Sequence, residues 1–186
     1  MSTPVVDLAF AHAWDAEILR SRPMILPRRH FVYPREVEEV ERGALEVMVR
    51  PREAQPFLAT CALGFRDAAA ASGVWAAPNP DEICCVAGGY AYVIDTTDPE
   101  RFTFVALRPV LEVRAAAAVG LLLFVGHRTV VAWGSEGQQW ESEKLSDEGV
   151  TVAHIDGWTL HGMGWSLMTD KESPFELDLR TGRRME

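Results

Sequence analysis

The stretch Gly120–Gly134, GLLLFVGHRTVVAWG, decides the fold class of this chain. Two runs of apolar and β-branched residues flank a short turn at Gly126-His127-Arg128, which is typical of two antiparallel strands joined in a hairpin. Glycine suits such a turn because tight hairpin turns need a positive φ angle. The sequence therefore predicts an antiparallel β hairpin at these residues.

Weaker copies of this hairpin lie on either side of it. The segment 83–95 (ICCVAGGYAYVID) aligns Gly88 with Gly126, and the segment 159–170 (TLHGMGWSLMTD) aligns Gly162 with the same glycine. Each copy continues through a polar turn into a third strand, and the first two copies add a fourth strand, at residues 110–113 and 150–155. We therefore predict a single β domain with three repeat units: residues 43–186 for the domain, and 83–117, 121–156 and 158–182 for the units.

The repeats resemble the blades of β-propellers of the WD or quinoprotein type. A period of about 40 residues with four antiparallel strands is the pattern of such blades, and TVVAWGSEGQQWE (residues 129–141) looks like the turn between their inner strands. The resemblance implies an all-β, propeller-like fold for residues 83–182. Three units of four strands also fit a β-trefoil, and a twisted meander or irregular sandwich is the third alternative.

The last unit ends without a fourth strand, which would leave an unpaired strand edge. The segment 44–50 alternates apolar and polar residues as a half-buried strand does, and Pro51 stops it. One interpretation is that this early strand pairs with the last unit and closes the domain.

Residues 1–42 differ from the repeats, and we predict a short helix followed by a basic extended arm. Apolar residues recur at three- and four-residue steps over residues 4–19, which is the helical period; they are Leu8, Ala11, Trp14 and Ile18. The arm, residues 20–35, contains five arginines, three prolines and no acidic residue. Subtracting those five positive charges from the net charge of −9 leaves −14 for the other residues. The arm is expected to lie on this acidic body; the alternatives are that it reaches a neighbouring subunit or partner, or that its arginines contact phosphates.

The totals restrict the class of protein. An acidic chain of 186 residues is an unlikely general nucleic-acid binder, because such proteins present an electropositive face. Three cysteines, two of them adjacent at Cys84-Cys85, make no disulfide framework and favour reduced thiols in the cytoplasm. The longest apolar run, residues 115–125, is about half of the ~20 residues that a membrane-spanning helix needs, and the N-terminus lacks the pattern of a signal peptide.

The known catalytic motifs for phosphate binding, nucleophilic serine and zinc hydrolysis do not occur. We therefore predict neither a cofactor nor a metal site, and no catalytic residue is assigned. Three groups remain as contact candidates for a partner or ligand: turn residues, tryptophans of the repeats and arginines of the arm. They are His127, Arg128, His161 and Asp170; Trp133, Trp140 and Trp165; and Arg28 and Arg29.

The functional prediction is a non-enzymatic, cytoplasmic binding or assembly module. It would act on a protein partner, or on a second copy of itself, through the aromatic-rich β surface and the arm. The alternative is a small-molecule enzyme or a metal-binding protein, with a site built from the turn histidines and nearby carboxylates.

Overall fold

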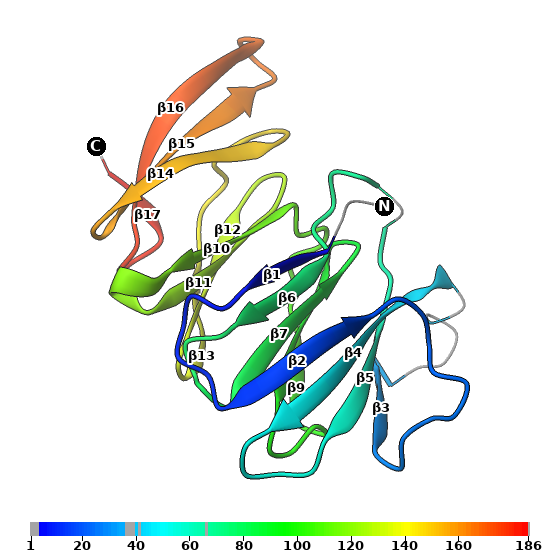
Figure 1. Cartoon of the computed structure of the whole chain (residues 1–186). Coiled ribbons are helices and arrows are strands. Elements are labelled where there is room, and N and C mark those ends of the chain that lie inside the picture. Colours follow the sequence, from blue (N-terminus) through cyan, green and yellow to red (C-terminus); the bar gives the residue numbers. More distant parts are fainter. Residues whose placement is uncertain (1–3, 36–39, 41, 66, 186) are drawn as a thin grey trace. The chain divides into compact units, whose positions relative to one another are not determined.

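The computed structural model describes residues 4–35, 40, 42–65 and 67–185. Within these ranges the chain is built of β strands and loops with no α-helix, so the prediction of an all-β fold is confirmed. No helical segment in the described part is long and apolar enough to cross a bilayer. The chain divides into two compact units, Met1–Val110 and Leu111–Glu186, which we describe separately (Figure 1).

The first sheet of the N-terminal unit has the strand order β2-β4-β5-β3. Its strands are β2 (Trp14–Leu19), β4 (Ala44–Pro51), β5 (Phe57–Ala62) and β3 (His30–Tyr33). Strand β4 pairs antiparallel with β2 and with β5, whereas β3 joins the free edge of β5 in parallel. The predicted strand at residues 44–50 is therefore confirmed, but it lies inside this sheet and does not pair with the end of the chain.

The second sheet of this unit has the order β1-β6-β7-β8-β9. Its strands are β1 (Val5–Asp7), β6 (Gly73–Ala76), β7 (Glu82–Ala87), β8 (Tyr90–Asp95) and β9 (Phe102–Phe104). The two sheets share one core, in which Trp14 and Phe57 of the first pack with Ile83 and Tyr92 of the second. The N-terminal unit is thus two sheets packed face to face.

The predicted helix over residues 4–19 is wrong, because this segment forms β1 and β2. In β2, Trp14, Ala16 and Ile18 alternate with two acidic residues, and Trp14 is only 1% exposed. Trp14 and Ile18 fit a period of two as well as a helical period. Pairing with β4 along the whole length of β2 decides in favour of the strand.

The C-terminal unit contains two four-stranded sheets whose strands follow one another in chain order. The third sheet consists of β10 (Glu112–Ala116), β11 (Leu121–Val125), β12 (Val130–Gly134) and β13 (Gly137–Glu141), with the 3₁₀ turn η2 (Ala117–Val119) after β10. The fourth sheet consists of β14 (Val150–Asp156), β15 (Thr159–Ser166), β16 (Lys171–Asp178) and β17 (Arg183–Arg184). The hairpin predicted from residues 120–134 is β11 and β12.

The third and fourth sheets share a core of their own. Leu123 and Val130 of the third sheet belong to the same buried cluster as Leu160 and Leu177 of the fourth sheet. All four of these side chains are fully buried. Each unit therefore has a separate two-sheet core.

The last copy of the hairpin is misaligned in the sequence prediction. Gly162 lies inside β15 rather than in a turn. A Cβ atom there would lie 2.5 Å from the ring of Phe175 and 2.7 Å from the carbonyl oxygen of Thr151, so the glycine permits a close approach between strands. The turns that flank β15 contain Gly157 and Asp170, which have φ angles of 54° and 49°.

Two further predicted strands pair differently from the expectation. The strands expected at 110–113 and 150–155 correspond to β10 and β14. Each pairs with the strand that follows it, β11 or β15, instead of completing the preceding unit. The fourth sheet is completed by β17, which pairs with residues 177 and 178 of β16.

Candidate functional site

A groove of about 350 Å³ opens in the C-terminal unit, beside the hairpin that decides the fold. It lies where the η2–β11 and β12–β13 turns meet the β14–β15 and β16–β17 turns. Its side chains combine two indoles with charged and amide groups: Trp140, Trp158, Arg180, Glu136 and Gln139. Of the predicted contact residues, Trp140 lines this groove.

Trp140 is held in place from two sides. Its indole nitrogen donates a hydrogen bond to the carbonyl oxygen of Leu179, at 2.9 Å. Gly182 lies so close to the indole that a Cβ atom there would come within 2.5 Å of the ring. The ring is thus a fixed wall of the groove that joins β13 to the β16–β17 turn.

Trp158 and Arg180 form the exposed side of the groove. The guanidinium carbon of Arg180 lies 4.8 Å from the centre of the Trp158 ring, and 38% of Trp158 is exposed. Glu136 supplies a negative charge to the same groove. The groove thus combines an aromatic face with a positively charged donor and a negatively charged acceptor. This combination suits a polar, extended ligand such as a peptide segment.

The predicted turn residues of the C-terminal unit lie outside this groove. His127 and Arg128 are exposed in the β11–β12 turn, and Asp170 is exposed in the β15–β16 turn. Trp133 is buried in β12, with 4% of its surface exposed.

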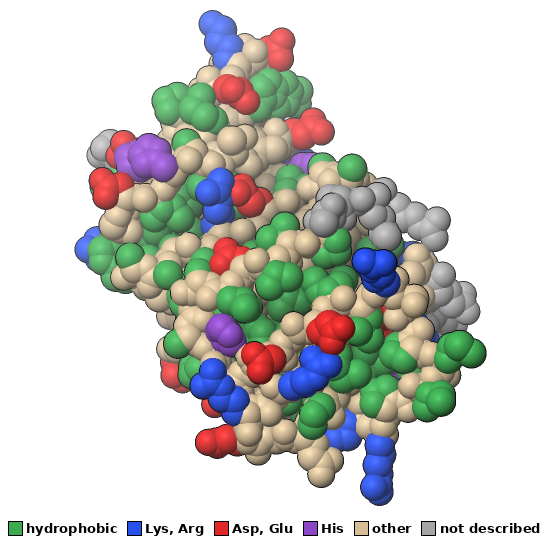
Figure 2. Space-filling model, viewed as in Figure 1, with side chains coloured by type: hydrophobic (Ala, Val, Ile, Leu, Met, Phe, Trp, Pro, Cys, Tyr) green, Lys and Arg blue, Asp and Glu red, His purple; other side chains and the backbone are tan. Residues whose placement is uncertain are grey.

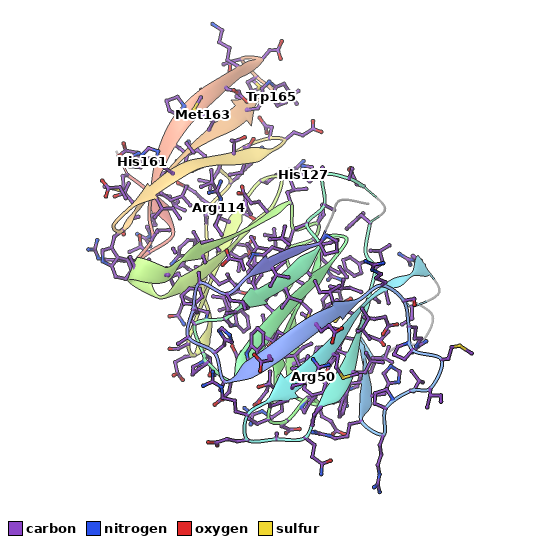
Figure 3. The ribbon with its side chains drawn as sticks, in the orientation of Figure 1. Arg50, Arg114, His127, His161, Met163 and Trp165 are labelled. Carbon is purple, nitrogen blue, oxygen red and sulfur yellow. The ribbon has the colours of Figure 1, made fainter. Side chains whose placement is uncertain are left out.

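His161 and Trp165 lie on the same face of β15, with Met163 between them (Figure 3). All three side chains are half-buried. The predicted residues therefore fall into separate places and do not meet in one cleft.

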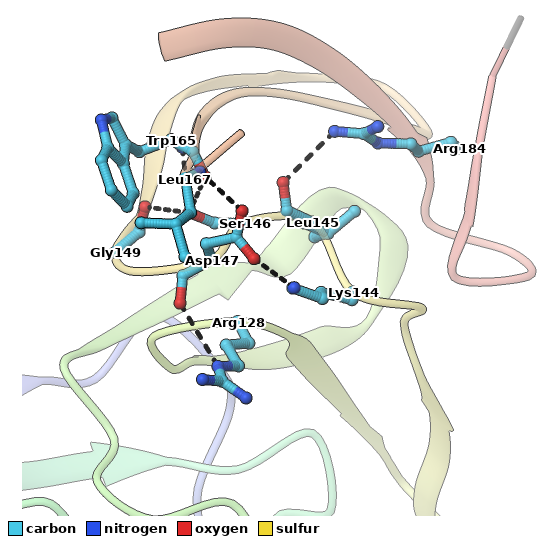
Figure 4. Close-up of polar contacts among 9 residues, drawn as sticks. All are labelled: Arg128, Lys144, Leu145, Ser146, Asp147, Gly149, Trp165, Leu167 and Arg184. Atoms are coloured by element: carbon cyan, nitrogen blue, oxygen red, sulfur yellow. Dashed lines mark hydrogen bonds and ion pairs between the residues drawn. The ribbon is translucent and has the colours of Figure 1, made fainter. Parts of the chain in front are cut away.

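The segment that connects the third and fourth sheets carries a polar joint (Figure 4). The Ser146 hydroxyl accepts a hydrogen bond from the Trp165 amide at 2.9 Å, and the Asp147 carboxylate accepts one from the Leu167 amide at 2.7 Å. Asp147 also pairs with Lys144, and Arg128 donates to its carbonyl oxygen at 3.3 Å. The hydrogen bond from Lys144 and that from the Leu167 amide lower the pKa of Asp147 below its ordinary value.

The polar groups named in this joint all bind partners within the C-terminal unit. Arg128 through its guanidinium group, and Trp165 through its backbone, therefore help to hold the connection between the two sheets. Sequence spacing does not indicate this role.

A row of three titratable side chains crosses the outer face of the fourth sheet. His154 of β14 pairs with His161 of β15, which in turn pairs with Glu176 of β16. The two imidazole rings are stacked, with centroids 4.3 Å apart and planes inclined by 10°. The Nδ1 atom of His161 lies 3.3 Å from a carboxylate oxygen of Glu176.

In the N-terminal unit, residues 20–29 of the predicted arm form a loop that runs from β2 to β3, and the following residues form β3 at the edge of the first sheet (Figure 1). Arg22 lies 3.6 Å from the buried carboxylate of Glu46 and 3.2 Å from His30. Arg29 donates to the Gln55 carbonyl oxygen at 2.7 Å and lies over the Phe31 ring. Both ends of the loop are therefore fixed to the first sheet.

The tip of this loop is the most exposed apolar segment of the described chain. Met24 is fully exposed, and Ile25 and Leu26 are 89% and 44% exposed. These side chains do not anchor the arm, whereas Tyr33, at the other end of the arm, is buried. Arg28 is exposed beside the tip.

A buried polar cluster supports the base of the loop. The Thr60 hydroxyl contacts both the Glu46 carboxylate and the imidazole of His30. Burial and the nearby Arg22 lower the pKa of His30, although Glu46 opposes this shift. Thr60 is fully buried, so the cluster organises the loop and has no hydroxyl accessible to a substrate.

Among the described residues, no group of three or more histidine, cysteine, aspartate and glutamate side chains is arranged to hold a metal ion. The three cysteines are buried free thiols. No protein-family model matches the chain, and no curated protein has a significantly similar sequence. The function is therefore argued from the geometry of the structure.

Proposed function

We propose that this protein is a non-enzymatic binding or assembly module that docks on a protein surface through the loop at residues 20–29. The observation that carries this proposal is the apolar tip at residues 24–26, where two large side chains are almost wholly exposed. Apolar groups presented to water in this way are typical of interaction sites. Pro23 and Pro27 restrict the tip, and Arg22 and Arg29 fix its base, so little ordering entropy is lost on docking.

We propose a second copy of this chain as the partner. The arm carries five arginines, whereas the remaining residues have a net charge of −14. Charge complementarity between the arm of one copy and the acidic surface of another would favour encounter and fix the orientation. Figure 2 illustrates the surface available, on which acidic, basic and apolar side chains are interspersed.

The groove at Trp140 and Trp158 is the second surface of the proposed module. Tryptophan and arginine are the side chains that most often dominate the energy of protein interfaces. An extended segment could lie against the two indoles, with Glu136 and Arg180 available to its polar groups. This groove supports a binding function because it offers shape and aromatic contact without a catalytic constellation.

The test is sedimentation velocity of the full chain over a wide range of concentration. We expect weak, reversible self-association, since a three-residue tip buries less area than a standard interface. The double variant Met24→Ser/Ile25→Ser should sediment as a monomer at concentrations where the wild type associates. Because both side chains are exposed, the variant should unfold at the same urea concentration as the wild type.

A matched control is available in the C-terminal unit. Leu167 and Met168 form another exposed apolar pair, with 69% and 92% of their surfaces accessible. The variant Leu167→Ser/Met168→Ser makes the same chemical change and should leave association intact. A wild type that stays monomeric at every concentration, or a tip variant that associates as the wild type does, would overturn the proposal.

We further propose that the third and fourth sheets are blade-like units of the propeller type, and that the protein is located in the cytoplasm. The support for the first part is that the third and fourth sheets are four-stranded meanders in chain order, as blades are. The support for the second part is the set of three unpaired cysteines.

A further inference from the structure

We infer that His154 and His161 form a two-imidazole binding site for a divalent late transition-metal ion, with Glu176 as the positioning residue. The three residues occupy one register row across three hydrogen-bonded strands. Side chains opposite each other in such a row lie on the same face, with Cβ atoms about 5 Å apart. The site goes beyond the proposed docking function and does not depend on it.

A β-bulge creates this row. The register between β14 and β15 shifts between Val152 and His154, so Ala153 is the extra residue. Without the bulge, Ala153 would lie opposite His161, and His154 would lie on the inner face opposite the buried Leu160. The bulge turns His154 outward to lie beside His161, in the way that bulges re-aim side chains at binding sites.

Glu176 prepares His161 for the metal. Its carboxylate lies 3.3 Å from Nδ1 of His161, which leaves Nε2 free to act as the metal ligand. Metal-bound histidines commonly donate their other ring N–H to a carboxylate, which fixes the tautomer and the orientation of the ring. The arrangement therefore supplies one oriented imidazole and one adjacent imidazole.

Rotation of one ring converts the stacked pair into a chelating pair, because each nitrogen lone pair lies in the plane of its ring and two parallel rings cannot both point at one ion. The ring centroids are 4.3 Å apart, whereas two nitrogen ligands of one tetrahedral ion are about 3.3 Å apart when each bond is about 2.05 Å. His154 is exposed, so its ring is free to rotate and bring the two nitrogens together. Water would complete the coordination, since two protein ligands are provided.

The ligand set determines the class of ion. Imidazole nitrogen favours zinc, copper and nickel over magnesium and calcium, which prefer oxygen. Asp156 and Asp178 lie on the next register row, opposite Thr159, and add negative potential near the site. Within the suitable metals, the order of affinity should follow the general series, with Cu²⁺ above Ni²⁺ and Zn²⁺.

The experiment is a calorimetric titration of the full chain with Zn²⁺ at neutral pH. We expect one ion per chain, and His154→Gln or His161→Gln should weaken binding at least about tenfold, because even residues that only orient a ligand contribute 10–100-fold. Glu176→Gln should have a smaller effect and should raise the population of the other His161 tautomer. That tautomer change is read from the ring ¹⁵N shifts.

The control is His127→Gln, which removes an exposed histidine from the β11–β12 turn and should leave Zn²⁺ binding unchanged. The wild-type protein gives a second measurement that needs no variant. Added Zn²⁺ should shift the ring ¹⁵N signals of His154 and His161 and leave that of His127 in place. Equal affinity in the wild type and the double variant His154→Gln/His161→Gln, or shifts confined to other histidines, would overturn the inference.

Discussion

Some glycines in this chain are required by what lies next to them and not by a positive φ angle. Gly164 illustrates this, because a Cβ atom there would lie 2.1 Å from the carbonyl oxygen of Leu145. That oxygen belongs to the connection between the third and fourth sheets, which the joint at Ser146 and Asp147 holds in place. A backbone atom fixed in this way cannot move aside for a methyl group.

We therefore expect Gly164→Ala to lower the free energy of unfolding by about 1–3 kcal/mol, the range for overpacking of a close contact. The measurement is urea denaturation followed by circular dichroism. Gly134→Ala is the matched control, since its added methyl group would meet the side chain of Gln139 at 3.0 Å, which can shift. Equal losses in the two variants would show that the Leu145 contact is not the cause.

Asp147 is expected to make the stability of the chain depend on pH. Its pKa is lowered in the folded state by the hydrogen bond from Lys144 and by that from the Leu167 amide. A carboxylate with a lowered pKa stabilises the fold above its unfolded pKa of about 4, and this contribution disappears as the pH falls through the folded pKa.

The variant Asp147→Asn should therefore be less stable than the wild type at neutral pH. The difference should shrink in acid, as the wild-type carboxyl becomes protonated. Urea unfolding of both proteins between neutral pH and about pH 3 measures this trend. A difference that is the same at every pH would mean that the charge of Asp147 is unimportant.

At the scale of elements, the local sequence pattern predicts strands well where two consecutive strands form a buried hairpin. The stretch 120–134 forms β11 and β12, and Trp140, which follows the next turn, lies in β13. The pattern fails where one set of residues fits two periods, as in residues 4–19, because pairing with a distant strand decides between them. It also fails at Gly162, where a glycine is needed because the ring of Phe175 lies close to it. Phe175 is on the neighbouring strand, so a local pattern does not include it.

The candidate site shows the same limits. Trp140 was predicted as a contact residue and lines the groove, but its companions Trp158, Arg180 and Glu136 come from turns of two sheets. The row at His154 depends on a bulge, which no spacing of histidines reveals. Strand register brings these groups together, and register is set by the whole sheet.

The β16–β17 turn is expected to depend on Trp140 of the neighbouring sheet. Trp140→Phe keeps an aromatic ring, although a smaller one, and removes the donor to the Leu179 carbonyl oxygen; the lost hydrogen bond should reduce the free energy of unfolding by about 0.5–1.5 kcal/mol. Amide hydrogen exchange should also accelerate in residues 179–184. Trp158→Phe is the control, because the described contact of Trp158 is with Arg180 and survives the change; equal effects in both variants would contradict this role.

At the scale of the whole molecule, charge and exposure are distributed unevenly. The chain has a net charge of −9, yet a run of three exposed apolar side chains, residues 24–26, lies in the arginine-rich loop at residues 20–29. The composition predicted the contrast in charge, but it did not predict that the tip would be exposed. The reason is that β3, at the end of the arm, completes the first sheet and leaves the preceding loop outside it.

This arrangement also determines how the loop can be tested. Deletion of residues 20–35 would remove the edge strand β3 and the buried Tyr33. A loss of association in that deletion could then reflect unfolding of the first sheet. A probe attached to the loop leaves the fold intact and therefore tests the loop more directly than the deletion does.

The most direct measurement is intermolecular paramagnetic relaxation enhancement from a spin label at Ser21→Cys. Ser21 is exposed beside the tip, and the native thiols are buried, with burial raising the pKa of Cys61 and Cys84, so labelling should be confined to the new cysteine. Labelled chain is mixed with ¹⁵N-enriched, unlabelled chain. We predict broadening of a defined set of surface amides in the ¹⁵N-enriched copy, abolished when the labelled chain also carries Met24→Ser/Ile25→Ser. Spectra without intermolecular broadening would contradict the assembly function.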